Sequence, residues 1–345
     1  MTKFCNVHIP DLTNLQKLLE LSKAEQLSNF GPVYRKFCKK MEKFLDVDIS
    51  RDFTLVTSGH TALMAAYDVL GCESLVMPAY TFESTRVAAT LQGIQPIIVD
   101  VDPKNGCLTV EILESIKQRW DSVVVVCALS TIPELERIDK YCKLNGKMLI
   151  IDGAASFGTP GIYNYGDAFC LSFHATKSFP LGEGGAVIAS HGLSAGIRSY
   201  INFGFNADRV PIRMGLNAKV SDYTAAIGCL LLDEIEPALN ARKKNVQMYK
   251  DLGLDEFILR SGSYNTTYQT LPIYLRPDIA TRARVALDQI GVEYKRYYKP
   301  LVDRLEANVP ITQKLFDENI CLPCHPAVTE DEIVRIVDAI RSAFT

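Results

Sequence analysis

Apolar residues in this chain gather in short continuous runs that are separated by stretches with helical periodicity. The runs occupy residues 75–77, 97–99, 123–126, 148–151, 169–173 and 186–188. A continuous apolar run is typical of a strand buried on both faces, and strands that alternate with helices form parallel sheets. The pattern therefore predicts an α/β fold built on one large, mainly parallel sheet.

Helical patterns flank this alternating region. Residues 33–45 place apolar side chains on one face of a helix, and residues 221–250 have the pattern of a long amphipathic helix. Beyond it come a strand-like segment at 270–275, a helix near 278–290, and a last helix that begins with a capping box at 329–332.

The alternation of buried strands and helices ends near residue 235, and this change of pattern predicts two domains. We expect residues 1–234 to form a large domain with a helical segment at its N-terminus, and residues 235–345 to form a smaller α+β domain. A chain of 345 residues is long enough for both units to bury a core.

Composition excludes several classes of protein. The formal net charge is −3, so no basic field is available to attract nucleic acid. The longest apolar run, residues 123–129, is too short to span a bilayer, and the first ten residues lack an apolar signal core. We therefore expect a cytoplasmic protein with reduced cysteines. The CxxC spacing at 321–324 lacks the second pair that a zinc site would need.

A lysine and an aspartate stand at the ends of two predicted strands. Asp152 closes the run 148–151, and Lys177 shortly follows the run 169–173. Pyridoxal 5′-phosphate (PLP) needs two such groups: a lysine that forms a Schiff base, and a carboxylate that keeps the pyridine nitrogen protonated. Taken singly, Lys177 could be a surface lysine and Asp152 a solvated or capping residue. His174 is expected to be structural, because Lys177 already supplies a proton shuttle.

Two further segments suit a phosphorylated, planar cofactor. Residues 57–63 follow a strand and open a helix, and free N–H groups at such a helix start bind phosphate. Phe82 follows the next strand, where an aromatic ring could stack on a planar group. Taken alone, the first segment could be an ordinary strand-to-helix turn and Phe82 a core residue.

The order and spacing of these features resemble the DegT/DnrJ/StrS family of PLP-dependent nucleotide-sugar aminotransferases. The resemblance runs from about residue 29 to the C-terminus. The stretches that carry it are residues 58–63, 78–82, 95–102, 151–158, 172–177, 182–185, 215–217, 221–228, 296–301 and 322–326. Taken together, these stretches are highly specific.

The resemblance implies a PLP-dependent transferase of fold type I. It implies that Lys177 is the Schiff-base lysine, that Asp152 is the partner of the pyridine nitrogen, and that Phe82 stacks on the ring. The backbone of His60 and Thr61 would bind the cofactor phosphate.

The resemblance also implies a homodimer with shared active sites. Ser172 would contribute a side-chain phosphate ligand, and Asn217 would reach the phosphate of the neighbouring subunit. Tyr297 and Tyr298 fall in a loop that family members place near the sugar.

Two positions depart from the family pattern. Ala155 stands where a Gln or His near the 3′-oxygen of the cofactor is usual, so we expect a water or another side chain to replace that donor. His60 stands where Thr is usual; the backbone N–H survives this change, but a hydroxyl is lost and an imidazole could add charge.

The implied activity is amino transfer from L-glutamate, through PLP and its amine form PMP, to a keto-sugar nucleotide, for surface polysaccharide or glycoside biosynthesis. One alternative is a PLP enzyme that acts on a small phosphorylated ketone or another non-sugar acceptor. Another is a non-catalytic relative, against which the joint presence of Asp152, Ser172, Lys177 and Asn217 argues.

Overall fold

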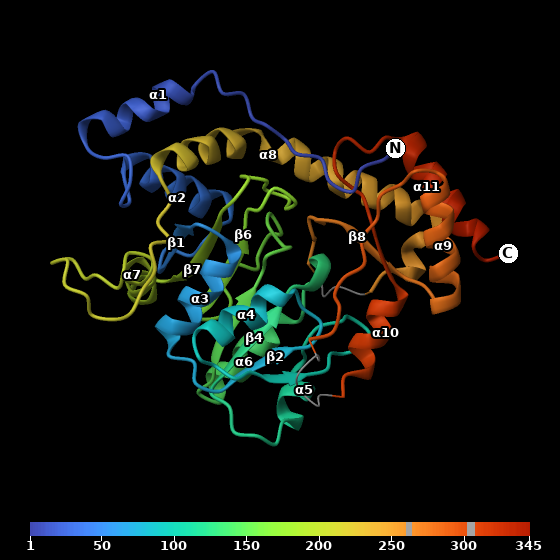
Figure 1. Cartoon of the computed structure of the whole chain (residues 1–345), viewed down its shortest axis with the longest axis horizontal. Coiled ribbons are helices and arrows are strands. Elements are labelled where there is room, and N and C mark those ends of the chain that lie inside the picture. The colour runs from blue at the N-terminus through green and yellow to red at the C-terminus, as the bar shows by residue number, and fades with distance from the viewer. Residues whose placement is uncertain (260–263, 302–307) are drawn as a thin grey trace.

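The computed structural model describes residues 1–259, 264–301 and 308–345 (Figure 1). Its strands are β1 (Arg51–Val56), β2 (Leu75–Pro78), β3 (Ile97–Val99), β4 (Ser122–Val126), β5 (Met148–Asp152), β6 (Ala168–Ser172), β7 (Gly185–Ser190), β8 (Leu271–Tyr274) and β9 (Asn319–Leu322). Its α-helices are α1 (Leu15–Leu19), α2 (Pro32–Phe44), α3 (Gly59–Leu70), α4 (Glu83–Leu91), α5 (Val110–Ser115), α6 (Leu135–Leu144), α7 (His191–Tyr200), α8 (Asp222–Tyr249), α9 (Pro277–Gln289), α10 (Pro310–Glu318) and α11 (Glu330–Ser342). The predicted strands and the α/β class are confirmed.

The large sheet presents the carboxyl ends of its strands at one edge. Within the described residues, seven strands pair in the order β1-β7-β6-β5-β4-β2-β3. β7 is antiparallel to both of its neighbours, whereas the other pairs are parallel. The carboxyl ends of β1, β2, β4, β5 and β6 therefore meet at one edge, which is where open α/β sheets bind ligands.

Helices cover both faces of this sheet (Figure 1). On one face, Phe37 of α2, Ile138 of α6 and Leu231 of α8 share a core with Val125. The opposite face packs against α3, α4 and α7, and its core includes Val124. Neighbouring residues of β4 enter opposite cores because side chains alternate across a strand. Burial on both faces explains the continuous apolar runs in the sequence.

Helix α8 links the large sheet to the C-terminal part of the chain, as Figure 1 shows. Leu231 and Leu232 pack in the core beside the sheet. Val246 and Tyr249, near the other end of the helix, pack in a second core with β8, β9, α9 and α11. The two cores therefore share one continuous helix, and residue 235 lies within it.

The first residues of the chain lie beside the C-terminal part, next to α11 (Figure 1). Thr2 forms a bridge with Val292, and the N–H of Phe4 donates to a carboxylate oxygen of Glu293 at 3.0 Å. The ring of Phe4 lies 6.5 Å from that of Tyr297, measured between centroids. The N-terminal segment is thus anchored close to the loop that carries the two predicted sugar-binding tyrosines.

Two expectations drawn from composition concern the cysteines, expected to be reduced, and the apolar runs, expected to be too short to span a bilayer. All ten cysteines, including Cys321 and Cys324, carry free thiols. Among the described residues, none of the helices combines the length and the apolar character that crossing a membrane requires.

Candidate active site

A cavity of about 380 Å³ opens at the carboxyl edge of the large sheet. Its volume lies in the range of small-molecule sites. Seven of the residues predicted from the sequence line it: His60, Phe82, Asp152, Ser172, Lys177, Tyr297 and Tyr298. The structure thus brings together groups that lie more than two hundred residues apart in the chain.

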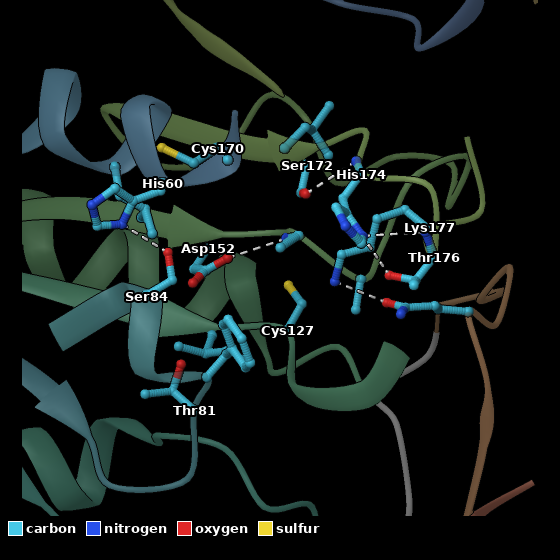
Figure 2. Close-up of a pocket in the computed structure, with 18 of the residues that line it drawn as sticks. His60, Thr81, Ser84, Cys127, Asp152, Cys170, Ser172, His174, Thr176 and Lys177 are labelled. Atoms are coloured by element: carbon cyan, nitrogen blue, oxygen red, sulfur yellow. Dashed lines mark hydrogen bonds between the residues drawn. The ribbon is translucent and has the colours of Figure 1, made fainter. Parts of the chain in front are cut away.

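Asp152 lies at the end of β5 with its carboxylate buried (Figure 2). The hydroxyl of Thr85 donates to Oδ2 at 2.8 Å, and the N–H of Ala154 donates to Oδ1 at 3.2 Å. Burial raises the pKa of Asp152, while these two hydrogen bonds and the nearby Lys177 act in the opposite direction. A buried carboxyl of this kind would gain strongly from a cationic partner in the cavity.

Lys177 lies in the turn that follows β6, and its amine points into the cavity (Figure 2). Nζ donates a hydrogen bond to Oε1 of Gln269 at 3.2 Å. Burial lowers the pKa of Lys177, and the charge of Asp152 opposes that effect. A lowered pKa increases the fraction of neutral amine, which is the form that attacks a carbonyl and accepts a proton.

The turn between β1 and α3 forms one wall of the cavity. Ser58 caps α3 by accepting the N–H of Thr61 at 3.1 Å, so Thr61 is buried in the first turn and does not line the cavity. Gly59 and His60 line it instead, at the N-terminus of a twelve-residue helix. Such a helix start attracts an anion.

The backbone at Gly59 packs so closely against Ser172 that a side chain has no room there. A Cβ on Gly59 would lie 2.8 Å from the Cβ of Ser172 and 3.3 Å from its Oγ. The glycine therefore keeps the helix start and the Ser172 hydroxyl next to each other. Together they could hold a phosphate group.

The imidazole of His60 connects two elements of the cavity wall. Its Nδ1 lies 2.9 Å from Oγ of Ser84, in the first turn of α4 (Figure 2). Both residues line the cavity. The departure from the usual threonine thus adds a link between the starts of α3 and α4.

Three aromatic side chains line the cavity, those of Phe82, Tyr297 and Tyr298. Phe82 is 59% exposed, and its ring centroid lies 6.5 Å from that of Tyr298. Tyr298 also packs edge-on against Tyr80, whose hydroxyl donates to the carbonyl of Tyr297 at 2.7 Å. Burial raises the pKa of Tyr297 and of Tyr298, so both phenols keep their protons at neutral pH and can donate hydrogen bonds.

Asn217 lies outside this cavity, on the segment between α7 and α8 that projects from the rest of the structure (Figure 1). It pairs with Asn202 across the base of this projection, and its Oδ1 accepts a hydrogen bond from Lys219 at 2.7 Å. Asn217 is exposed, so a role in phosphate binding would require the cavity of another subunit.

The residues that hydrogen-bond the side chains of Lys177 and Asp152, Gln269 and Thr85, have no counterpart in the sequence-based predictions. Gln269 precedes β8 and carries no motif, so nothing in the sequence indicates that it reaches Lys177. Thr85 binds Asp152 and also lies 2.8 Å from the hydroxyl of Thr81, measured between Oγ1 atoms. No motif in the sequence analysis marked either threonine as a partner of Asp152.

The residues around the cavity match the donor set that PLP requires. Asp152 could hold a protonated ring nitrogen, and Lys177 could react with an aldehyde. The helix start at Gly59 and the hydroxyl of Ser172 could hold a phosphate, and the exposed face of Phe82 could stack on a ring. The cavity thus holds a buried carboxyl group whose pKa is raised and a half-buried lysine whose pKa is lowered, a combination typical of a reactive centre.

Residues 10–341 match the DegT/DnrJ/EryC1/StrS aminotransferase family. The chain belongs to this family. The resemblance inferred from the sequence is therefore confirmed, and with it the aminotransferase class.

Individual members of the family resemble the chain over most of its length. It is 27% identical to a dTDP-4-amino-4,6-dideoxy-D-glucose transaminase from Shigella dysenteriae, with 97% of this chain and 96% of that protein covered. It is 26% identical to a UDP-2-acetamido-2-deoxy-3-oxo-D-glucuronate aminotransferase from Pseudomonas aeruginosa, with 83% and 84% covered. The solved aminotransferase TlmJ from Streptoalloteichus hindustanus has a TM-score of 0.86 at 21% identity, with 99% and 98% covered. The predicted type I fold is confirmed.

Replacing Gly59 by alanine is expected to weaken PLP binding. The added methyl group would displace Ser172 from the helix start, and losing one hydrogen bond to a charged group raises a dissociation constant about 10- to 100-fold. Absorbance titration of the cofactor-free protein with PLP measures this constant. Gly192→Ala is the matched control, because an added Cβ in α7 meets nothing within 4 Å. Equal affinities for the two variants would contradict the assignment of the phosphate site.

Proposed function

We propose that this protein is a PLP-dependent transaminase that moves the amino group of L-glutamate to the keto group of a nucleotide-linked sugar. The observation that carries the proposal is the presence of a buried Asp152 and a half-buried Lys177 in one cavity at the carboxyl edge of the sheet. The product would supply an amino sugar for surface polysaccharides or glycosides.

The residues around the cavity divide the work of such a reaction. When bound, PLP supplies an electron sink that stabilises negative charge at the carbon losing its proton. Asp152 would hold the ring nitrogen in its protonated form through a charge-assisted hydrogen bond. Lys177 would carry the proton between donor carbon and cofactor carbon, because its amine has a lowered pKa and lies inside the cavity.

The nucleotide-sugar part of the proposal rests on the relatives and on a second hollow beside the cavity. The two curated relatives described above are named for aminotransfer to sugars that carry dTDP or UDP. The second hollow shares Thr81, Phe82, Tyr297 and Tyr298 with the main cavity. It adds the basic residues Arg296 and Lys299, and also Glu83, whose carboxylate pairs with Arg86. Phenols beside a guanidinium and an ammonium suit a sugar that is linked to a diphosphate.

A substrate panel tests the proposal. The holoenzyme would be incubated with L-glutamate and with 3-keto and 4-keto sugars carrying dTDP, UDP or GDP, and amino products would be detected by mass spectrometry. Formation of an amino sugar supports the proposal. Transfer to small phosphorylated ketones alone would indicate a non-sugar acceptor. A purified protein with no visible absorbance band that borohydride removes would indicate a non-catalytic relative.

We also propose that the active unit is a homodimer with shared sites. The projection that carries Asn217 exposes Phe203, Ile212 and Met214, and burying such side chains against a second copy would stabilise a dimer. Asn217 would then complete the phosphate site of the neighbouring subunit.

Mixing two inactive variants is expected to restore part of the activity. In a hybrid dimer of Lys177→Ala and Asn217→Ala subunits, one of the two sites regains both groups if Asn217 acts across the interface. With random exchange, about a quarter of the sites become functional. The measurement is turnover after exchange of differently tagged subunits. A mixture that stays inactive despite proven exchange would show that each site is built within one chain.

A further inference from the structure

Gln269 reaches the cavity from the C-terminal part of the chain. It stands two residues before β8 and lines the same cavity as Asp152 and Lys177. Its Oε1 accepts the hydrogen bond that Nζ of Lys177 donates, at 3.2 Å, which is the dashed line drawn from the lysine amine in Figure 2.

The backbone of Gln269 is fixed by two other elements. Its N–H donates to Oγ of Ser130 at 2.9 Å, and its carbonyl accepts from the guanidinium of Arg242 in α8, also at 2.9 Å. Ser130 in turn donates to the carbonyl of Ala155 at 3.0 Å. Ser130 and Arg242 are both buried. Gln269 is therefore tied to the loops after β4 and β5 and to the helix that both cores share.

These bonds matter because an amide can accept from an amine without adding charge. Because hydrogen bonds hold both the N–H and the carbonyl of Gln269, its side chain starts from a fixed backbone position. The hydrogen bond to its Oε1 can then orient the amine of Lys177. A carboxylate at the same position would attract the ammonium form. An apolar side chain would leave a buried amine without this acceptor.

We propose that Gln269 is a positioning residue that holds the free amine of Lys177 toward the reacting atoms. Because its amide is neutral, it does so without placing a negative charge beside that amine. The proposal rests on the proposed function, because it matters whenever Lys177 is not bonded to cofactor and must carry a proton. Under this proposal a residue just before β8 takes part in the reaction, in addition to the motif residues Asp152 and Lys177.

Replacing Gln269 by glutamate separates charge from shape. The two side chains are nearly isosteric, but a carboxylate beside the amine should raise the pKa of Lys177. Competition labelling of the cofactor-free protein with acetic anhydride across pH, with Lys177 read by peptide mass spectrometry, measures that pKa. We expect the labelling profile of Lys177 to move to higher pH in Gln269→Glu. An unchanged profile would overturn the proposal.

Replacing Gln269 by methionine removes the acceptor and keeps the volume. We expect kcat to fall about 10- to 100-fold, because displacing a reacting group by about 1 Å can lower a rate by that much. The KM for glutamate should change little, since Gln269 would act on Lys177 rather than on the donor. A kcat equal to that of the wild type would overturn the proposal.

Gln92→Met is the matched control for the methionine variant. The amide of Gln92 donates to the hydroxyl of Tyr200 and to the carbonyl of Met64, away from the cavity, so its loss tests a generic missing amide bond. We expect normal kcat in this variant. A fall equal to that of Gln269→Met would assign the effect to stability and overturn the proposal.

The labelling experiment also distinguishes this proposal from the proposed function. It uses neither cofactor nor substrate, so it reports on the contact between Gln269 and Lys177 even if no keto-sugar nucleotide in the panel is accepted. Conversely, the protein could prove to be an active sugar aminotransferase while the labelling profile of Lys177 is the same in wild type and Gln269→Glu. The proposed function would then stand, and the role of Gln269 would be wrong.

Discussion

Replacing Lys177 by alanine is expected to abolish amino transfer while leaving the fold intact. The variant loses the amine that would react with the aldehyde and move the proton between donor and cofactor. General acid–base catalysis alone contributes a factor of about 10²–10⁴, so turnover should fall by at least that much. Lys177 lines the cavity, so shortening its side chain opens space in the cavity and not in a packed core.

Turnover with glutamate and the thermal unfolding midpoint are the two measurements for this variant. Lys147→Ala is the matched control, because Lys147 stands at the opposite end of β5 from Asp152 and packs over the ring of Trp120, 4.6 Å from its centroid. The control should keep normal turnover. Near-normal activity of Lys177→Ala would remove Lys177 from the mechanism, whereas loss of folding in Lys177→Ala alone would show a structural role for this lysine.

The hydrophobic pattern was enough to predict the large sheet, because burial on both faces makes its strands continuous apolar runs. It could not predict the reversal of β7, since an antiparallel strand buried between β1 and β6 has the same pattern as a parallel one. Nor could it show that the first residues pack beside Val292 and Glu293. Short pairings between distant segments depend on the folded arrangement, and their local composition carries no trace of it.

The candidate site divides in the same way. Asp152 and Lys177 could be found because Asp152 ends β5 and Lys177 lies in the turn after β6, and the carboxyl ends of both strands face the site. Gln269 could not be found in this way, because it lies far from Lys177 in the sequence. The two residues meet only once the segment after α8 has packed beside the cavity. Thr61 shows a third case: its motif was visible, but the structure shows its N–H bonded to Ser58. Its place in the cofactor site stays a prediction.

Asp152→Asn is expected to lower turnover and to stabilise the cofactor-free protein. Asparagine cannot carry the charge that would keep the ring nitrogen protonated, and losing such an electrostatic contact at a reacting centre costs about 10²–10³ in kcat. PLP should also be held less tightly. Steady-state kinetics and PLP titration measure these two losses.

The stability change has the opposite sign because burial raises the pKa of Asp152 in the folded protein. The folded state then binds this proton more tightly than the unfolded state does, so ionising the carboxyl costs stability. That cost is absent below the ordinary aspartate pKa, grows as pH rises toward the raised value, and stays constant above it. Asparagine avoids the cost, so its unfolding midpoint should exceed that of the wild type at neutral pH and converge with it in acid.

Asp222→Asn gives the contrast that makes this result decisive. Asp222 is also buried, but its carboxylate caps α2 by accepting the N–H groups of Val33 and Tyr34 at 3.1 and 2.9 Å, and it accepts the hydroxyl of Ser22 at 2.6 Å. Losing these bonds should cost about 0.5–2 kcal/mol of stability and leave kcat unchanged. An Asp152→Asn protein that is less stable than wild type and still active would place Asp152 in the same structural class as Asp222, and the assignment of the ring-nitrogen partner would fail.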